Sequence, residues 1–88
     1  MDKTLVEETV IKVVELIKTL PNGTETTTAI LTGEVLGKEF VNNEPIELME
    51  INQRIFEECE KINITLDNSE YNDSIVGLPY NIPFIVRH

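Results

Sequence analysis

The sequence predicts an α+β domain in which three helices pack against a small antiparallel β-hairpin or sheet. Two observations lead to this prediction. Apolar residues recur at helical spacing through the first two thirds of the chain, and they alternate with polar residues in the last third. The chain has 88 residues, of which 41% are hydrophobic and 26% charged. We therefore expect residues 1–88 to form a single domain with one modest core.

The first helix is predicted over residues 4–20, where apolar side chains form one stripe. The stripe consists of Val6, Val10, Val13, Val14, Ile17 and Leu20. It is widened by Leu5, Ile11 and Leu16. A helix this apolar is expected to pack against two elements or against a second subunit. Thr4 and Glu7 have the spacing of a capping box, and Pro21-Asn22-Gly23 ends the helix because proline cannot continue it.

Two short elements are expected next. The β-branched threonines of residues 24–28 suit an edge strand, although Thr27 or Thr28 could instead cap the following helix. That helix is predicted over residues 29–36, and Gly37 suits its left-handed C-terminal cap. Its expected core residues are Ile30, Leu31, Val35 and Leu36.

The third helix is predicted over residues 45–62. Asn43 is a suitable N-cap and Pro45 is tolerated in the first turn. Phe40 and Val41, just before it, are expected in the core. The apolar line of this helix consists of Leu48, Ile51, Ile55, Cys59 and Ile62, flanked by Met49 and Phe56.

The pattern then changes to the two-residue period of a strand. Residues 63–67 alternate between polar and apolar, and residues 83–87 form a second apolar stretch. We expect these two segments to pair as a hairpin around the polar loop at residues 68–74. Two prolines exclude a regular central strand from residues 75–83.

This order of elements resembles that of the winged-helix domains, a variant of the helix-turn-helix class. The Leu-Pro-Asn-Gly-Thr turn at residues 20–24 and the Gly-Leu-Pro-Tyr-Asn segment at residues 77–81 are also similar to small bacterial and phage proteins of uncharacterised function. The winged-helix resemblance implies that the helix over 45–62 is in the recognition position and that residues 63–67 and 83–87 are the wing strands. It also implies DNA binding, although fold alone does not confer function.

The charge of the chain opposes that implied activity. Seven Lys and Arg stand against 16 Asp and Glu, which gives a net charge of −9. The excess is concentrated in residues 44–88, where nine acidic residues face three basic ones. Such a surface is a poor non-specific partner for nucleic acid or for an anionic membrane. No run of residues is long and apolar enough to span a bilayer.

Three polar neighbours in the third helix, Asn52, Gln53 and Arg54, are the nucleic-acid candidates because such side chains read base edges. The simpler interpretation is a solvated helix face. In that case Glu50 is expected to pair with Arg54, and Glu57 with Lys61, at i, i+4 spacing. Too few other cations are present to anchor the phosphates first.

No residue pattern indicates catalysis, a metal or a cofactor. Cys59 is on the apolar line of the third helix, and His88, the single histidine, is the last residue. The polar cluster of residues 67–73 departs from the calcium-loop pattern, because Tyr71 falls at the fifth position and the sixth is not glycine. Its oxygen-bearing residues are Asp67, Glu70, Asn72 and Asp73. We therefore expect a protein that is not an enzyme.

The remaining candidates are apolar residues kept irregular by Gly77 and the prolines. They either complete the core or form an exposed patch that binds a protein, with Tyr80 as the best anchor. The partner-binding candidates are Ile75, Val76, Leu78 and Tyr80.

The expected function is that of a small acidic protein-interaction domain. Its partner is a basic protein or a second copy of the chain, docked through the first helix. The alternatives are a dimeric winged-helix transcriptional regulator that binds DNA and an acidic DNA mimic that inhibits a nucleic-acid enzyme. Met1-Asp2-Lys3 does not resemble a signal peptide and one cysteine cannot form an internal disulfide, so a cytoplasmic location is expected.

Overall fold

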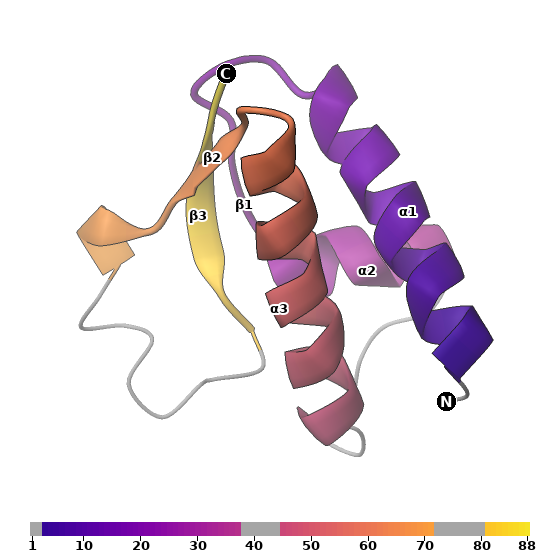
Figure 1. Cartoon of the computed structure of the whole chain (residues 1–88). Helices are drawn as coiled ribbons and strands as arrows, with labels where there is room; N and C mark the ends of the chain where they lie inside the picture. Colours follow the sequence, from indigo (N-terminus) through magenta and orange to yellow (C-terminus); the bar gives the residue numbers. More distant parts are fainter. Residues whose placement is uncertain (1–2, 38–44, 72–80) are drawn as a thin grey trace.

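The computed structural model describes residues 3–37, 45–71 and 81–88 and confirms the α+β class (Figure 1). Each helix and strand begins and ends within a few residues of its prediction. In chain order the elements are α1 (Lys3–Thr19), β1 (Glu25–Thr27), α2 (Thr28–Leu36), α3 (Pro45–Lys61), β2 (Thr65–Asp67), the 3₁₀ turn η1 (Ser69–Tyr71) and β3 (Pro83–Arg87).

The three strands form one antiparallel sheet in the order β1-β3-β2. The predicted hairpin pairing is confirmed, with Leu66 opposite Val86, although β2 is shorter than the expected 63–67. On the other side, β1 pairs with β3 and places Thr26 opposite Phe84. The last strand of the chain is therefore the centre of the sheet.

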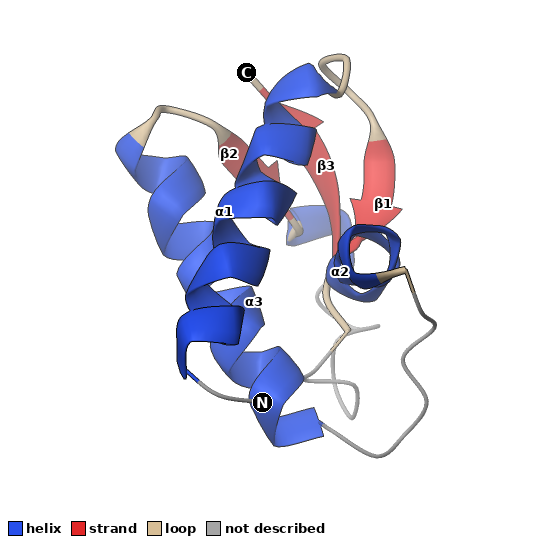
Figure 2. Cartoon of the chain, turned by 90° about the vertical axis from the view of Figure 1, so that its right-hand side faces the viewer, coloured by secondary structure: helices blue, strands red, loops and turns tan. Residues whose placement is uncertain are grey.

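Both interpretations of the threonine segment are correct. Thr27 is the last residue of β1 and also the N-cap of α2, where its hydroxyl oxygen accepts a hydrogen bond of 3.2 Å from the Ile30 N–H. Gly37 ends α2 with a φ of 70°, as predicted, and its N–H donates to the Gly33 carbonyl. Figure 2 shows α2 nearly end-on, beside the strand from which it starts.

The side of α2 that faces the core differs in part from the prediction, since Leu31 and Val35 contact the core as expected but Ile30 does not. Ile30 is 56% exposed, whereas Thr28, Leu31 and Thr32 are buried. The cap at Thr27 fixes where the helix begins. The side chains of residues 28, 31 and 32 then lie on the face of the helix that points inward. The apolar Ile30 is left outside because tertiary packing outweighs its preference for burial.

The expected capping box of α1 is wrong. Thr4 lies inside the helix, which already includes Lys3, and the Glu7 carboxylate binds Arg54 on α3 instead. The predicted end of α1 is confirmed by the turn at Pro21-Asn22-Gly23, in which Gly23 has a φ of 91°.

The core lies where α1, α3 and the sheet meet. Phe84 of β3 is fully buried, and its ring packs edge-on against Phe56 of α3, with centroids 6.1 Å apart and planes at 79°. Around them the α1 stripe packs as predicted, except that Leu20 is only partly buried. Of the predicted α3 line, Ile51, Ile55 and Cys59 are buried and Ile62 is 40% exposed, whereas the Leu48 side chain lies outside the described part of the chain. The buried cluster consists of Val6, Val10, Val13, Val14, Ile17, Leu31, Ile51, Ile55, Cys59, Ile64, Leu66, Phe84 and Val86.

Several residues that the sequence places in the core are exposed or lie outside the described residues. Leu5 and Ile11 of α1 are 39% and 60% exposed, and Met49 of α3 is 45% exposed. Phe40 and Val41 lie outside the described residues. Among the described residues, no helix combines the length and the apolar character needed to cross a membrane.

Candidate functional site

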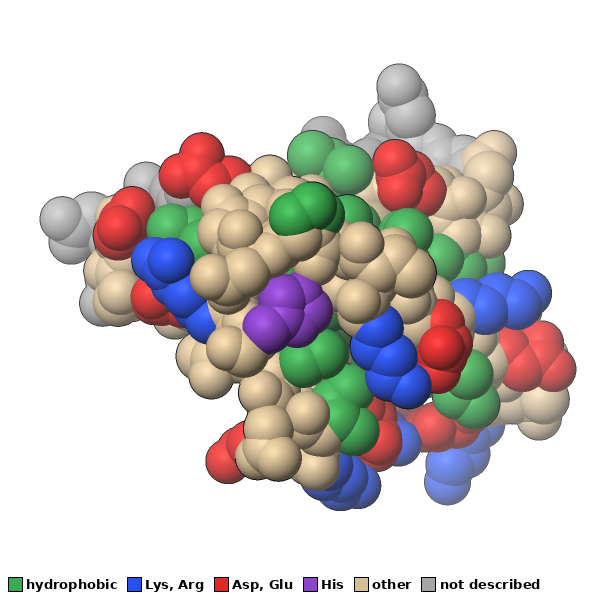
Figure 3. Space-filling view, turned by 90° about the horizontal axis from the view of Figure 1, so that it is seen from above, with side chains coloured by type: hydrophobic (Ala, Val, Ile, Leu, Met, Phe, Trp, Pro, Cys, Tyr) green, Lys and Arg blue, Asp and Glu red, His purple; other side chains and the backbone are tan. Residues whose placement is uncertain are grey.

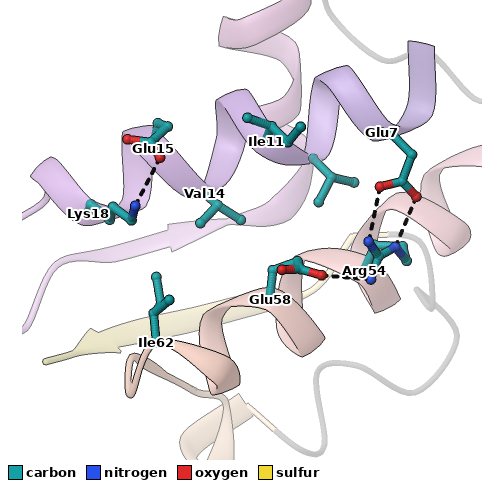
Figure 4. Close-up of a pocket in the computed structure, with 9 residues that line it drawn as sticks. Glu7, Ile11, Val14, Glu15, Lys18, Arg54, Glu58 and Ile62 are labelled. Carbon is teal, nitrogen blue, oxygen red and sulfur yellow. Dashed lines mark hydrogen bonds and ion pairs between the residues drawn. The ribbon is translucent and has the colours of Figure 1, made fainter. Parts of the chain in front are cut away.

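Arg54 of α3 is held by Glu7, Glu57 and Glu58, and it links α3 to α1. Figure 4 shows Arg54 with Glu7 and Glu58. Its Nε and Nη2 donate to the two carboxylate oxygens of Glu7, at 3.1 and 3.0 Å. Its Nη1 donates to Glu57 at 3.1 Å and to Glu58 at 3.0 Å. We call these four residues the Arg54 cluster.

The cluster corrects the ion pairs expected from spacing along one helix. Arg54 pairs with Glu7, Glu57 and Glu58 in place of Glu50, and Lys61 pairs with Glu58, at 3.1 Å, in place of Glu57. The bidentate contact to Glu7 has the parallel two-bond geometry that favours arginine over lysine. The hydrogen bonds that Arg54 donates to these glutamates raise its pKa above its ordinary value.

This arrangement also places the three nucleic-acid candidates. Asn52 is 2% exposed and lies among the core residues, which removes it from any base-reading surface. Gln53 is exposed and donates to Glu57 at 3.2 Å, and the Arg54 guanidinium is engaged by the cluster. Because all three residues are polar, the sequence suggested that they share one exposed face. The turn of the helix instead directs the Asn52 side chain into the core.

Acidification is expected to weaken the contact between α1 and α3. Hydrogen bonds from Arg54 lower the pKa of Glu7 below its ordinary 4.5, and those from Lys61 and Arg54 do the same for Glu58. Because both carboxyls are more acidic in the folded chain, they stabilise it above pH 4.5, and this contribution is lost as the pH falls through their folded pKa values.

The measurement is the urea midpoint followed by circular dichroism as the pH falls from about 6 to about 3. Arg54→Met should give a lower midpoint at the higher pH and a shallower fall with acidification. The matched control is Lys12→Met, which removes an exposed cation of α1. An Arg54→Met protein whose pH dependence matches that of the parent chain would contradict this role of the cluster.

Beside the cluster, α1 and α3 border an open groove of about 330 Å³ (Figure 4). Its apolar part includes Val14 of α1 and two exposed side chains, Ile11 on α1 and Ile62 just after α3. Glu15 and Lys18 lie on its rim and form an ion pair of 2.9 Å. We call this feature the α1–α3 groove.

A second open hollow, of about 430 Å³, lies between the end of α3 and β2. The chain turns there at Asn63, which has a φ of 63°, a left-handed conformation that asparagine tolerates. Phe56 contributes an aromatic surface and Glu60 an exposed carboxylate. We call it the α3–β2 hollow, and its lining residues are Phe56, Glu60, Asn63, Ile64, Thr65 and Leu66.

Exposed carboxylates lie along α3, and one of them, Glu60, lines this second hollow. Glu50, Glu57 and Glu60 are all exposed on α3, and we call these three residues the acidic face. The acidic residues of α3 outnumber its two cations, Arg54 and Lys61, and both cations are paired with glutamates. Part of the charge excess expected from the sequence is therefore presented to solvent along α3.

The residues considered as a nucleophile or as metal ligands are engaged in the fold itself. Cys59 is fully buried, and burial raises the pKa of its thiol to about 11, which disfavours the reactive thiolate. Asp67 accepts hydrogen bonds from the Ser69 N–H at 3.0 Å and the Ser69 hydroxyl at 2.7 Å. Among the described residues, no group of three or more His, Cys, Asp or Glu side chains could hold a metal ion.

His88, which the sequence left without a role, ties the end of the chain to the turn after α1. Its N–H donates to Asn22 Oδ1 at 2.9 Å, and its ring Nε2 is 2.7 Å from the Leu20 carbonyl oxygen.

The partner-binding candidates Ile75, Val76, Leu78 and Tyr80, and the loop residues Asn72 and Asp73, lie outside the described residues. No protein-family model, curated protein or solved structure matches the chain.

Proposed function

We propose that this chain is a small non-enzymatic domain of winged-helix type that binds a basic protein through the acidic face and the α3–β2 hollow. The order of helices and strands supports the winged-helix assignment, because α3 follows a short helix and precedes the hairpin strands. The single observation that carries the function is the charge of α3. Its exposed carboxylates face solvent, and Arg54, its one central cation, is already held by glutamates.

The α3–β2 hollow is suited to a long cationic side chain of the partner. Phe56 offers an aromatic surface, and Ile64 and Leu66 line the same hollow. Lys and Arg bury their aliphatic stems along such surfaces and keep the charged end free. The exposed Glu60 carboxylate is at the rim to receive that end. A phosphate would instead meet like charge at the same position.

The acidic face also supports a second candidate function, that of a DNA mimic. A row of exposed carboxylates on α3 offers the kind of negative surface that a nucleic-acid enzyme binds. Both candidates require a basic protein partner. They differ in one observable, because a DNA mimic competes with DNA for its partner.

The test begins with a tagged chain used to capture proteins at low salt, followed by affinity measurement on the purified pair. Glu60→Gln removes one carboxylate at the hollow, and Glu34→Gln removes an exposed carboxylate from α2 as the matched control. We expect Glu60→Gln to weaken binding about three- to tenfold, mainly in the association rate, and added salt to weaken it further. Glu34→Gln should leave the affinity unchanged.

Three results would contradict the proposal. The first is that the tagged chain captures no protein that binds it directly. The second is that Glu60→Gln and Glu34→Gln weaken binding equally. The third is that the affinity of the purified pair does not depend on salt. Addition of duplex DNA to the complex then separates the two candidates, because displacement of the partner supports the DNA mimic.

A further inference from the structure

The turn between α1 and β1 contains an asparagine followed by a glycine, Asn22 and Gly23, and both residues are exposed. Asparagine is a chemically labile residue. It is most labile before glycine, whose missing side chain leaves the backbone nitrogen unhindered. This pair of residues is therefore a place where the chain can modify itself, provided that the fold allows the two reacting groups to meet.

The reaction at such a pair is deamidation through a cyclic imide. The Gly23 backbone nitrogen loses its proton and attacks Cγ of Asn22, and the bond from Cγ to the side-chain nitrogen breaks. That nitrogen leaves with the proton as ammonia. Water then opens the imide at either of its carbonyl carbons, which gives aspartate or isoaspartate. In isoaspartate the main chain runs through the side chain and is longer by a methylene carbon.

In the folded chain, the end of β3 occupies both reacting groups. The Gly23 N–H donates to the Val86 carbonyl at 2.7 Å, and Asn22 Oδ1 accepts from the His88 N–H at 2.9 Å. Loss of the Gly23 proton is disfavoured, because the resulting anion would face the lone pairs of the Val86 oxygen. The bond from His88 keeps the Asn22 side chain in one orientation.

Further hydrogen bonds fix the turn against β3. The Thr24 N–H and hydroxyl both donate to the Pro21 carbonyl, at 3.1 and 2.6 Å, and the Val86 N–H donates to the Thr24 carbonyl at 2.8 Å. Beyond Val86 the strand is exposed, and Figure 3 shows His88, the single histidine, in purple at the surface. Exposed ends of elements open at a lower free energy than the core does, so the end of β3 can leave the turn without global unfolding.

From these contacts we propose that Asn22 is a deamidation site whose reactivity the end of β3 controls. The site does not react while Val86 and His88 hold the turn, and it reacts when the end of β3 leaves. Isoaspartate then lengthens the backbone next to Gly23, so the original hydrogen bonds to β3 no longer form in register. This site is separate from the acidic face and goes beyond the proposed function.

Peptide mapping by mass spectrometry tests this proposal, because deamidation changes the mass of the peptide that contains Asn22. The chain is incubated in mildly alkaline buffer, with and without enough urea to unfold it, and circular dichroism verifies the two states. We expect Asn22 to react at least about tenfold faster in the unfolded chain.

Two variants of His88 separate its N–H from its ring. His88→Pro removes the N–H that holds Asn22 and suits the extended conformation of Arg87 in β3. His88→Ala is the matched control, because it removes the ring and keeps the N–H. Without urea, we expect Asn22 to react about three- to tenfold faster in His88→Pro than in His88→Ala. Asn68, between β2 and η1, is the internal control and should react at the same rate in both variants.

Any of four results would overturn the proposal. The first is that Asn22 does not react in the unfolded chain, and the second is that it reacts equally fast in the folded one. The third is that His88→Pro and His88→Ala give the same rate at Asn22. The fourth is that His88→Pro accelerates Asn68 as much as Asn22, which would indicate global unfolding. All four concern the isolated chain and leave the basic partner of the acidic face to its own test.

Discussion

Replacement of Phe84 by alanine is expected to remove a large part of the stability of the domain. Phe84 is fully buried in β3, the central strand, and its ring packs edge-on against Phe56 of α3. The substitution deletes the aromatic contact between β3 and α3 and leaves a cavity, at a cost of about 3–5 kcal/mol. Small domains have only about 5–15 kcal/mol in total.

The measurement is urea unfolding followed by circular dichroism. The control is Ile30→Ala, which truncates an aliphatic side chain that is 56% exposed. It should change the free energy of unfolding by no more than about 0.5 kcal/mol. A Phe84→Ala protein with a free energy of unfolding close to that of this control would show that the sheet does not depend on the aromatic pair.

The second largest effect is expected from Thr28→Val. Thr28 is fully buried at the start of α2, and two hydrogen bonds of 3.0 Å join it to Ile82, just before β3. The Thr28 N–H donates to the Ile82 carbonyl, and the Ile82 N–H donates to the Thr28 hydroxyl oxygen. Valine keeps the shape of the side chain but leaves the Ile82 N–H without its acceptor, at a cost of about 1–3 kcal/mol.

The matched control for this change is Thr24→Val. The Thr24 hydroxyl also makes a backbone hydrogen bond, of 2.6 Å to the Pro21 carbonyl, but at an exposed position where water can replace it. We expect the loss in Thr24→Val to be clearly smaller by the same unfolding measurement. Equal losses in the two variants would contradict a special role for the hydroxyl that joins α2 to the sheet.

Periodicity predicted the helices because each one contains an apolar stripe that must be buried. The buried positions of α1 and α3 repeat every three or four residues, and that spacing is visible in the sequence. The same reasoning fails for polar residues in the core. Thr28, Thr32 and Asn52 are buried although their side chains are polar. Their inward placement follows from the phase of each helix, and composition alone assigns such residues to the surface.

The candidate site was less predictable because it depends on contacts between distant residues. Arg54 and Glu7 are 47 positions apart, and local spacing instead suggested Glu50 as the partner. The α3–β2 hollow likewise joins Phe56 of the helix to Leu66 of the strand after it. The charge excess of the second half of the chain could be read directly, but its exposure along α3 required the packed structure.

The most direct test of a basic protein partner is a nuclear magnetic resonance map of the labelled chain titrated with the captured partner. We predict that the amide shifts that change most belong to the end of α3 and to β2, near Phe56, Glu60 and Leu66. Changes confined to the exposed side of α1, or no changes at saturating partner, would contradict the account.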